Sequence, residues 1–338
     1  MKFNDLKASI ITQFNTPNGH KFVPFILGKP GGGKSSCARE IAEAVAKERG
    51  IPSERIVEFN PSLREPTDIL GLPVMTGECS KWLPPEEFYA VREGQGPSIL
   101  IIEELSDAGM DMQNPLCRVI LDRCAGQMKL SNELYIIATG NRTEDRSGAM
   151  RLSTKLANRM RLLNFEESLD DWLKWAQDHG VTPILRQFIR FRPALLSDFD
   201  PNRPVNPTPR AWEDVSRIPM DMDPSLFYEH VAGCVGEGAA SEYCGFIRIF
   251  ESLPDLDEIE AHPTKADVPS DPCILYALVA KLATMATKKN FNNLFKYIQR
   301  MPPEFMTVAV VEASKECPEI MGTKAFTDFA MKSVGVFI

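Results

Sequence analysis

The residues with the clearest chemistry form one short run, Gly28–Ser35, which reads Gly-Lys-Pro-Gly-Gly-Gly-Lys-Ser. It fits the pattern G-x-x-x-x-G-K-[ST], in which backbone N–H groups surround the phosphates of a nucleotide. The chain must turn these groups inward, so we expect positive φ angles at the glycines Gly31–Gly33. Lys34 would reach the β- and γ-phosphates, and the Ser35 hydroxyl would ligate Mg²⁺. The predicted nucleotide-binding residues are Gly28, Pro30, Gly31, Gly32, Gly33, Lys34, Ser35 and Ser36.

A pair of acids follows a second informative run, the apolar residues Ile99–Ile102. Consecutive apolar residues indicate a strand buried on both faces, as in a parallel sheet, and ligands bind beyond the carboxyl ends of such strands. In phosphate-loop ATPases this place holds an acid for the Mg²⁺ shell and, in one large group, a second acid that activates water. We therefore predict that Glu103 ligates Mg²⁺, directly or through water, and that Glu104 acts as the general base.

A third buried strand is indicated by Leu134–Thr139, which is followed by Gly140 and Asn141. An amide at the end of a strand, next to the acids, can hydrogen-bond both the γ-phosphate and the attacking water. Asn141 is therefore predicted to be catalytic. Several arginines follow within residues 142–161, and because most surface arginines are solvated, their positions alone assign them no role.

These residues need a scaffold of alternating strands and helices, and the apolar pattern predicts one. Strands are expected at 22–27, 55–59 and 162–165, and the phosphate loop is followed by a helical pattern with Ala38, Ile41 and Val45 on one face. The Pro- and Gly-rich segment 60–97 is expected to be functional or to hold small inserted elements. After residue 166 the pattern is helical, with an exposed connector expected at 255–272 and later helices at 224–236, 240–252, 271–288, 290–300, 303–316 and 323–334.

The overall composition narrows the class of protein. A content of 43% hydrophobic and 25% charged residues is ordinary for a soluble globular chain, and 338 residues suffice for two or three domains. The net charge of −8 argues against a protein whose main role is to coat nucleic acid. The scattered cysteines lack C-x-x-C spacing, which favours reduced thiols in the cytoplasm over zinc or disulfides. No apolar run is long enough for a signal peptide or a membrane span, so we expect no membrane partner.

As a set, these motifs resemble those of AAA+ ATPases, and in detail those of the MoxR type. The run Glu103–Ala108 and the helix residues that follow it are similar to the acid pair and next helix of that family. Pro66–Gly71 resembles the segment before its helix-2 insert, and Leu156–Met160 resembles the end of its arginine-finger helix. Pro207–Ala211 resembles the start of its sensor-2 helix. The resemblance covers residues from about 20 to 215, and it departs from the family at Glu103, where Asp is usual.

The resemblance implies an α/β fold, in which a phosphate-loop parallel sheet is sandwiched by helices as an AAA+ core. A helical lid and a helical C-terminal extension follow. The implied domains are 1–165 for nucleotide binding, 166–220 for the lid with sensor 2, and 221–338 for the extension. By the same resemblance, Arg210 acts on the γ-phosphate in its own subunit, and Arg159 completes the site of a neighbouring subunit. Arg151 and Arg161 are the competing candidates for that second role.

The function implied by the resemblance is that of a ring-forming motor, usually a hexamer, which hydrolyses ATP with Mg²⁺. It would remodel or activate a protein client, with a von Willebrand factor A protein as partner. Two alternatives stay open: a nucleic-acid-acting or restriction-type NTPase motor, which the acidic charge disfavours, and the motor subunit of a metal chelatase. A preference for GTP also stays open, because residues 142–147 are similar to a motif of restriction-associated GTPases.

Overall fold

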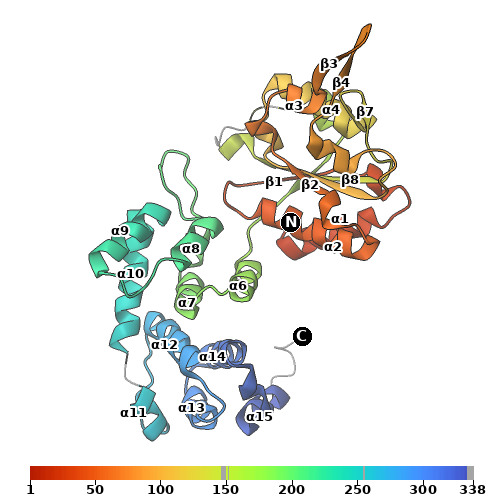
Figure 1. Ribbon diagram of the computed structural model, residues 1–338. Coiled ribbons are helices and arrows are strands. Elements are labelled where there is room, and N and C mark those ends of the chain that lie inside the picture. The colour runs from red at the N-terminus through yellow and green to blue at the C-terminus, as the bar shows by residue number, and fades with distance from the viewer. Residues whose placement is uncertain (146–149, 151, 254–255, 333–338) are drawn as a thin grey trace. The chain divides into compact units, whose positions relative to one another are not determined.

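The computed structural model describes residues 1–145, 150, 152–253 and 256–332 of the chain (Figure 1). These residues form two compact units. The first holds Met1–Asp171 together with Phe199–Pro204, and the second holds Trp172–Asp198 and the chain from Val205 onward. Residues 166–171 and 199–204 of the predicted lid fall in the first unit, and the rest of the predicted lid falls in the second unit with the C-terminal extension. The predicted domain boundaries at 165 and 220 stay predictions. No helix among the described residues is both long enough and apolar enough to cross a membrane.

The first unit is built on one parallel sheet, as predicted. Its strand order is β2-β5-β8-β1-β9, and every neighbouring pair is parallel. Because the strands are parallel, their carboxyl ends meet at one edge, and the register pairs Gly28 with Asn141 at that edge. The strands are β1 (Pro24–Gly28), β2 (Ile56–Phe59), β5 (Ser98–Ile102), β8 (Leu134–Asn141) and β9 (Arg161–Asn164).

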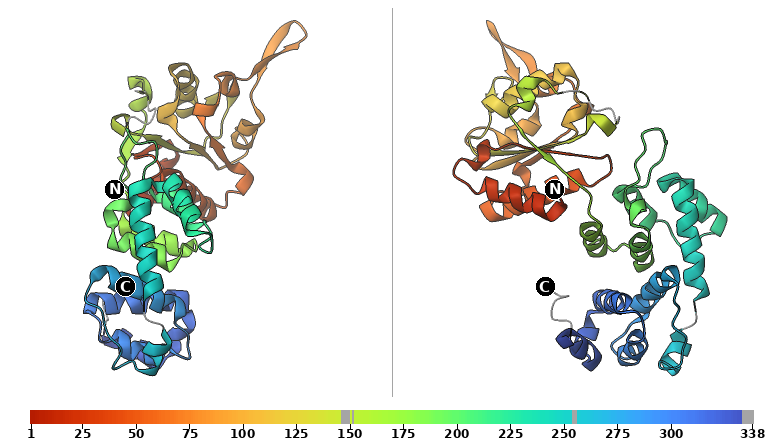
Figure 2. Two further views of the ribbon diagram at one scale, coloured as in Figure 1. Left: turned by 90° about the vertical axis from the view of Figure 1, so that its left-hand side faces the viewer. Right: turned by 180° about the vertical axis from the view of Figure 1, so that it is seen from behind.

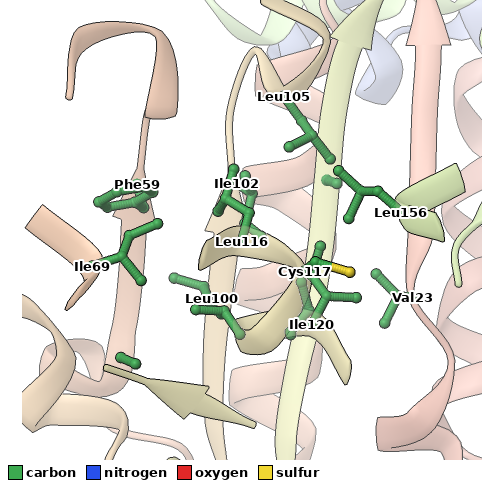
Figure 3. Close-up of a cluster of buried hydrophobic side chains, with 14 of the residues drawn as sticks. Val23, Phe59, Ile69, Leu100, Ile102, Leu105, Leu116, Cys117, Ile120 and Leu156 are labelled. Carbon is green, nitrogen blue, oxygen red and sulfur yellow. The ribbon is translucent and has the colours of Figure 1, made fainter. Parts of the chain in front are cut away.

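Helices cover both faces of this sheet (Figures 1 and 2). One face packs against α1 (Phe3–Phe14) and α2 (Lys34–Arg49), and Ile99 and Ile101 of β5 point to this side. The other face packs against α4 (Met110–Asp122), and Leu100 and Ile102 point there (Figure 3). Alternate residues of β5 therefore enter different cores, which explains why the whole strand is apolar.

The segment between β2 and β5 carries small inserted elements. They are α3 (Thr67–Leu70) and an antiparallel hairpin formed by β3 (Leu72–Thr76) and β4 (Cys79–Leu83). The hairpin is exposed along its length and projects from the rest of the unit (Figures 1 and 2). A second hairpin, β6 (Cys124–Ala125) and β7 (Met128–Lys129), turns at Gly126–Gln127. Before β9 lies α5 (Thr154–Ala157), a single helical turn.

The second unit is helical, as predicted. An aromatic core holds it together, in which Trp212 contacts Phe188 and Tyr243. The expected exposed connector at 255–272 is wrong in part, because it contains a helix, α11, whose Ile259 is buried. The helices are α6 (Leu169–Asp178), α7 (Pro183–Phe191), α8 (Pro209–Ser216), α9 (Pro224–Val235), α10 (Glu237–Ser252), α11 (Leu256–Ala261), α12 (Pro272–Met285), α13 (Phe291–Ile298), α14 (Pro303–Glu316) and α15 (Lys324–Lys332).

Candidate active site

The phosphate loop joins the end of β1 to the start of α2, in the order that the sequence predicts. Gly31 and Gly33 have φ angles of 70° and 98°, values at which a glycine has no steric cost. The first turn of α2 leaves N–H groups without partners inside the helix, and the helix dipole places partial positive charge there. An anion is therefore favoured at this loop.

Gly32 corrects one expectation, because its φ is not among the positive values of the loop. Here a side chain would be crowded by its neighbours. A Cβ atom at Gly32 would lie 2.4 Å from Oε1 of Glu167 and 3.3 Å from the carbonyl oxygen of Lys29. Glu167 comes shortly after β9, so the chain that leaves the sheet packs directly against the phosphate loop.

Lys34 and Asn141 are brought together, as their predicted roles require. The Nζ atom of Lys34 donates to Oδ1 of Asn141 at 2.9 Å and to the carbonyl oxygen of Lys29 at 2.6 Å. The Lys34 side chain is largely buried at the first residue of α2. A bound γ-phosphate would thus meet the ammonium and the amide side by side.

Two residues that sequence reasoning missed hold Asn141 in place. The Oγ atom of Ser106 accepts from the backbone N–H of Asn141 at 2.7 Å and donates to Oδ1 of Asp107 at 2.7 Å. Asp107 also accepts a longer bond, of 3.4 Å, from Nδ2 of Asn141. Ser106 and Asp107 belong to a short 3-10 helix, η5 (Leu105–Asp107), directly after the acid pair. The acids and the amide are therefore linked through two neighbouring strands.

Glu103 follows β5 and forms an ion pair. Its Oε1 accepts from Nη2 of Arg39 at 2.9 Å. The same guanidinium binds Glu58 with two bonds, from Nε to Oε1 at 2.8 Å and from Nη2 to Oε2 at 2.9 Å. These hydrogen bonds to Glu58, helped by the charge of Glu103, raise the pKa of Arg39 above its usual value. Arg39 is therefore a fixed positive charge beside the acid that the sequence assigns to the metal.

Glu104 has left-handed backbone angles, φ 51° and ψ 36°, which a residue with a side chain seldom adopts. Such angles cost about 1–3 kcal/mol and persist where the surroundings fix them. The Glu104 N–H donates to Oγ1 of Thr139 on β8 at 3.3 Å. Its Oε2 accepts from Nδ2 of Asn60 at 3.0 Å and from Oγ of Ser62 at 3.2 Å. The carboxylate is thus held by the segment that directly follows β2.

The donor atoms at this edge fit Mg²⁺. The Ser35 hydroxyl lies in the first turn of α2, and the Glu103 carboxylate lies at the end of β5. Both are hard oxygen donors, and Mg²⁺ usually takes one or two such protein ligands, with substrate phosphates and waters completing the shell. Within the described residues, no group of three or more His, Cys, Asp or Glu side chains could hold a metal alone. The donor set therefore suits Mg²⁺ bound together with a phosphate.

Arg159 lies away from this edge of its own subunit. It is exposed in the turn between α5 and β9, and the register pairs Arg161 with Pro24, the first residue of β1. The phosphate loop follows the other end of β1, about 13 Å further along at ~3.3 Å per residue. Arg161 itself donates to Gln13 at 2.7 Å and covers the ring of Phe22. Arg151, the other candidate, lies outside the described residues.

Arg210 belongs to the second unit. It is exposed in the first turn of α8, which Thr208 caps by accepting from the N–H of Ala211 at 3.1 Å. Its predicted approach to the γ-phosphate therefore stays a prediction. The remaining nucleotide-binding residues, Pro30 and Ser36, lie in the loop and in the first turn of α2.

The sequence reasoning also missed several residues that contact the acid pair or Asn141 beyond the carboxyl ends of the strands. Asn60 directly follows the predicted strand 55–59, so the rule that located Asn141 could also have located Asn60. Ser62, Arg39 and Ser106 have no such signal, because the predicted site residues that they contact, Glu104, Glu103 and Asn141, lie 42, 64 and 35 residues away in the sequence.

The parallel sheet, the phosphate loop between β1 and α2, and the polar residues beyond β5 and β8 define the core of an AAA+ protein. Residues 24–160 match the family model of the AAA domain of the dynein-related subfamily. This part of the chain is therefore similar to the AAA domains of that subfamily, and the similarity supports nucleotide binding.

Among solved structures, the chain is similar to NtrX from Brucella abortus, with 15% identity, coverage of 98% of this chain and 68% of that chain, and a TM-score of 0.37. It is also similar to a structure of NtrX from Brucella abortus in complex with ADP, with 15% identity, coverage of 99% and 68%, and a TM-score of 0.35. No curated protein sequence matches the chain.

Proposed function

We propose that this protein is a Mg²⁺-dependent ATPase that assembles into a ring, usually a hexamer, and uses ATP hydrolysis to remodel or activate a protein client. The observation that carries the proposal is the convergence of Lys34, Asn141 and the acid pair at one edge of an AAA domain. A partner with a von Willebrand factor A domain is part of the proposal, on the strength of the MoxR resemblance.

In the proposed reaction, the phosphate loop binds the triphosphate, and Lys34 moves its hydrogen bonds from Lys29 and Asn141 to phosphate oxygens. Asn141 then orients the attacking water. Glu104 accepts a proton from that water while the water oxygen bonds to the γ-phosphorus and the bond to the leaving ADP oxygen breaks. Ser35 and Glu103 would hold Mg²⁺, whose chemistry here is to neutralise charge on the β- and γ-phosphates.

Substitutions at Lys34 and Glu104 test this proposal. Lys34→Ala should abolish binding of a fluorescent ATP analogue, because the phosphates lose their main cation. Glu104→Gln should keep binding and stop phosphate release, because an amide cannot accept the proton. Binding and turnover of ATP and of GTP are measured side by side to decide which nucleotide the protein prefers. Turnover by Glu104→Gln at the wild-type rate would refute the role of Glu104 as general base. A wild-type protein that binds neither nucleotide would refute the whole proposal.

The ring proposal assigns Arg159 to the site of the neighbouring subunit. Its exposure and its distance from its own phosphate loop support this assignment, because both leave it available to a neighbouring subunit. An arginine supplied from outside can raise the hydrolysis rate by ~10³–10⁵. Arg159→Ala should bind ATP and hydrolyse it poorly. Mixing it with inactive Lys34→Ala should restore part of the turnover, since some interfaces then join an intact Lys34 to an intact Arg159. Mass analysis of the mixture shows whether subunits exchange, and proven mixed rings without recovery would refute the assignment.

A protein client is supported by the β3–β4 hairpin. Its Leu72 and Met75 are 63% and 74% exposed, and Trp82 and Leu83 are also exposed. Large apolar side chains on a projecting element are typical of protein-binding surfaces. The net charge of −8 gives no such support to a nucleic-acid-acting motor, whose affinity for DNA or RNA should fall steeply with salt. Turnover stimulated many-fold by DNA would favour that alternative.

A further inference from the structure

The guanidinium of Arg39 occupies an unusual place beside the candidate metal ligand. It is anchored by two hydrogen bonds to Glu58 and donates a third to Oε1 of Glu103, at 2.9 Å. The three residues come from different elements: Arg39 from α2, Glu58 from β2, and Glu103 from the end of β5. The β2–β5 register pairs Glu58 with Ile101, so Glu58 lies on the strand next to β5, which Glu103 directly follows.

Arg39 also lies beside the other candidate ligand. Ser35 and Arg39 are four residues apart on α2, which puts them on the same helix face. Helical side chains lean toward the N-terminus of their helix, so the Arg39 side chain extends toward the turn that carries Ser35. The positive charge thus contacts Glu103 and belongs to the helix face that carries Ser35, the other group that would hold Mg²⁺.

We propose that Arg39 is a built-in counter-ion that competes with Mg²⁺ for Glu103, and that Glu58 anchors it in this position. Arg39 is a positioning residue in this sense, since it acts through Glu103. The inference rests on the proposed function. Its consequence is that Glu103 is neutralised before a nucleotide arrives, and Mg²⁺ enters efficiently only when phosphate oxygens contribute the rest of its shell.

The energetics favour this role over a structural one. The side chains of Arg39 and Glu58 are 46% and 43% exposed, and exposed ion pairs contribute little to stability. Glu103, by contrast, is only 16% exposed, so a cation at its carboxylate has a larger effect. Removing one unit charge next to a divalent ion, even in surroundings close to water, should change the affinity for that ion by about threefold to tenfold.

The test measures Mg²⁺ dependence and needs no turnover. A fluorescent, non-hydrolysable ATP analogue is titrated at a series of buffered free Mg²⁺ concentrations. Arg39→Gln should lower the Mg²⁺ concentration for half-maximal binding by about threefold to tenfold. Lys47→Gln is the matched control, because it removes the same charge from an exposed position near the other end of α2. It should leave the half-saturation within about twofold of wild type.

A double variant shows whether Arg39 acts through Glu103. In a Glu103→Gln background, Arg39→Gln should shift the half-saturation by less than about twofold, because the contested ligand is gone. A full shift in that background, an equal shift with Lys47→Gln, or no shift with Arg39→Gln would each overturn the inference. These outcomes leave the proposed function intact, because that function is tested separately, by nucleotide binding to the wild-type protein and by the turnover of the Lys34 and Glu104 variants.

Discussion

Ser106→Ala tests how the amide of Asn141, which is predicted to be catalytic, is held. The Ser106 side chain is 3% exposed and makes two hydrogen bonds, one from the N–H of Asn141 and one to Oδ1 of Asp107, both 2.7 Å long. Alanine removes the hydroxyl and leaves the Asn141 N–H and the Asp107 carboxylate without this partner. The end of β8 is then free to shift relative to η5.

The cost follows from these contacts. A buried donor that loses its partner costs about 1–3 kcal/mol, so we expect a loss near 2 kcal/mol in the free energy of unfolding. For a unit of roughly 150–250 residues this corresponds to a fall in Tm of about 4–8 °C. Misplacing the Asn141 amide should lower kcat by about tenfold to a hundredfold, with a smaller change in KM.

Ser131→Ala is the matched control. Ser131 is also 3% exposed and also has two hydrogen bonds, to the carbonyl oxygen of Gly96 at 2.6 Å and from the N–H of Glu133 at 3.2 Å. It precedes β8, whereas Asn141 ends that strand. Thermal unfolding and phosphate release are measured for both variants. Both should lose similar stability, and only Ser106→Ala should lose turnover.

The refuting result is specific. If Ser106→Ala falls in Tm like Ser131→Ala and keeps the wild-type kcat, then Ser106 stabilises the fold without positioning Asn141. If the two variants lose turnover equally, the loss reflects general destabilisation.

Three further predictions concern the loop, the second unit and the thiols. Gly32→Ala should weaken binding of an ATP analogue by about twofold to tenfold in a titration, because its Cβ would lie 3.3 Å from the backbone carbonyl oxygen of Lys29 and would also push the Glu167 carboxylate aside; unchanged affinity would contradict this. Glu312→Gln should cost about 1–3 kcal/mol in chemical denaturation, because it removes a buried carboxylate charge that pairs with Arg186 at 3.0 Å and with Arg190 at 3.1 Å, and leaves buried Arg186 with Glu316 alone; a loss below ~0.5 kcal/mol would refute it. Burial raises the pKa of Cys37 from 9.0 to about 12, so its thiol should react with maleimide more slowly than exposed Cys79 at pH 8, and equal labelling rates would contradict this. The contribution of the neutral Cys37 thiol to the free energy of unfolding should be lost as the pH rises from 9 toward 12, and thermal unfolding across that range measures this loss.

The sequence alone determined the main parts of the site. A phosphate loop is a local structure with a fixed residue pattern, so Gly28–Ser35 could be placed without a fold. Apolar runs reveal buried parallel strands, and the rule that ligands bind beyond their carboxyl ends located Glu103, Glu104 and Asn141. These predictions rest on periodicity and on what immediately follows each strand, and both are local properties of the chain.

Only the tertiary structure decided which side chains contact and hold Glu103 and Asn141. Arg39 lies 64 residues before Glu103, and Ser106 lies 35 residues before Asn141, so no local pattern links either pair. Their contacts depend on the strand order, which places β5 between β2 and β8, and on the register of those strands. The same holds at Gly32, where the sequence predicted a backbone angle and the structure shows a close approach by the Glu167 side chain. Side-chain partners across a sheet are set by packing between distant segments, which the pattern of a single segment does not contain.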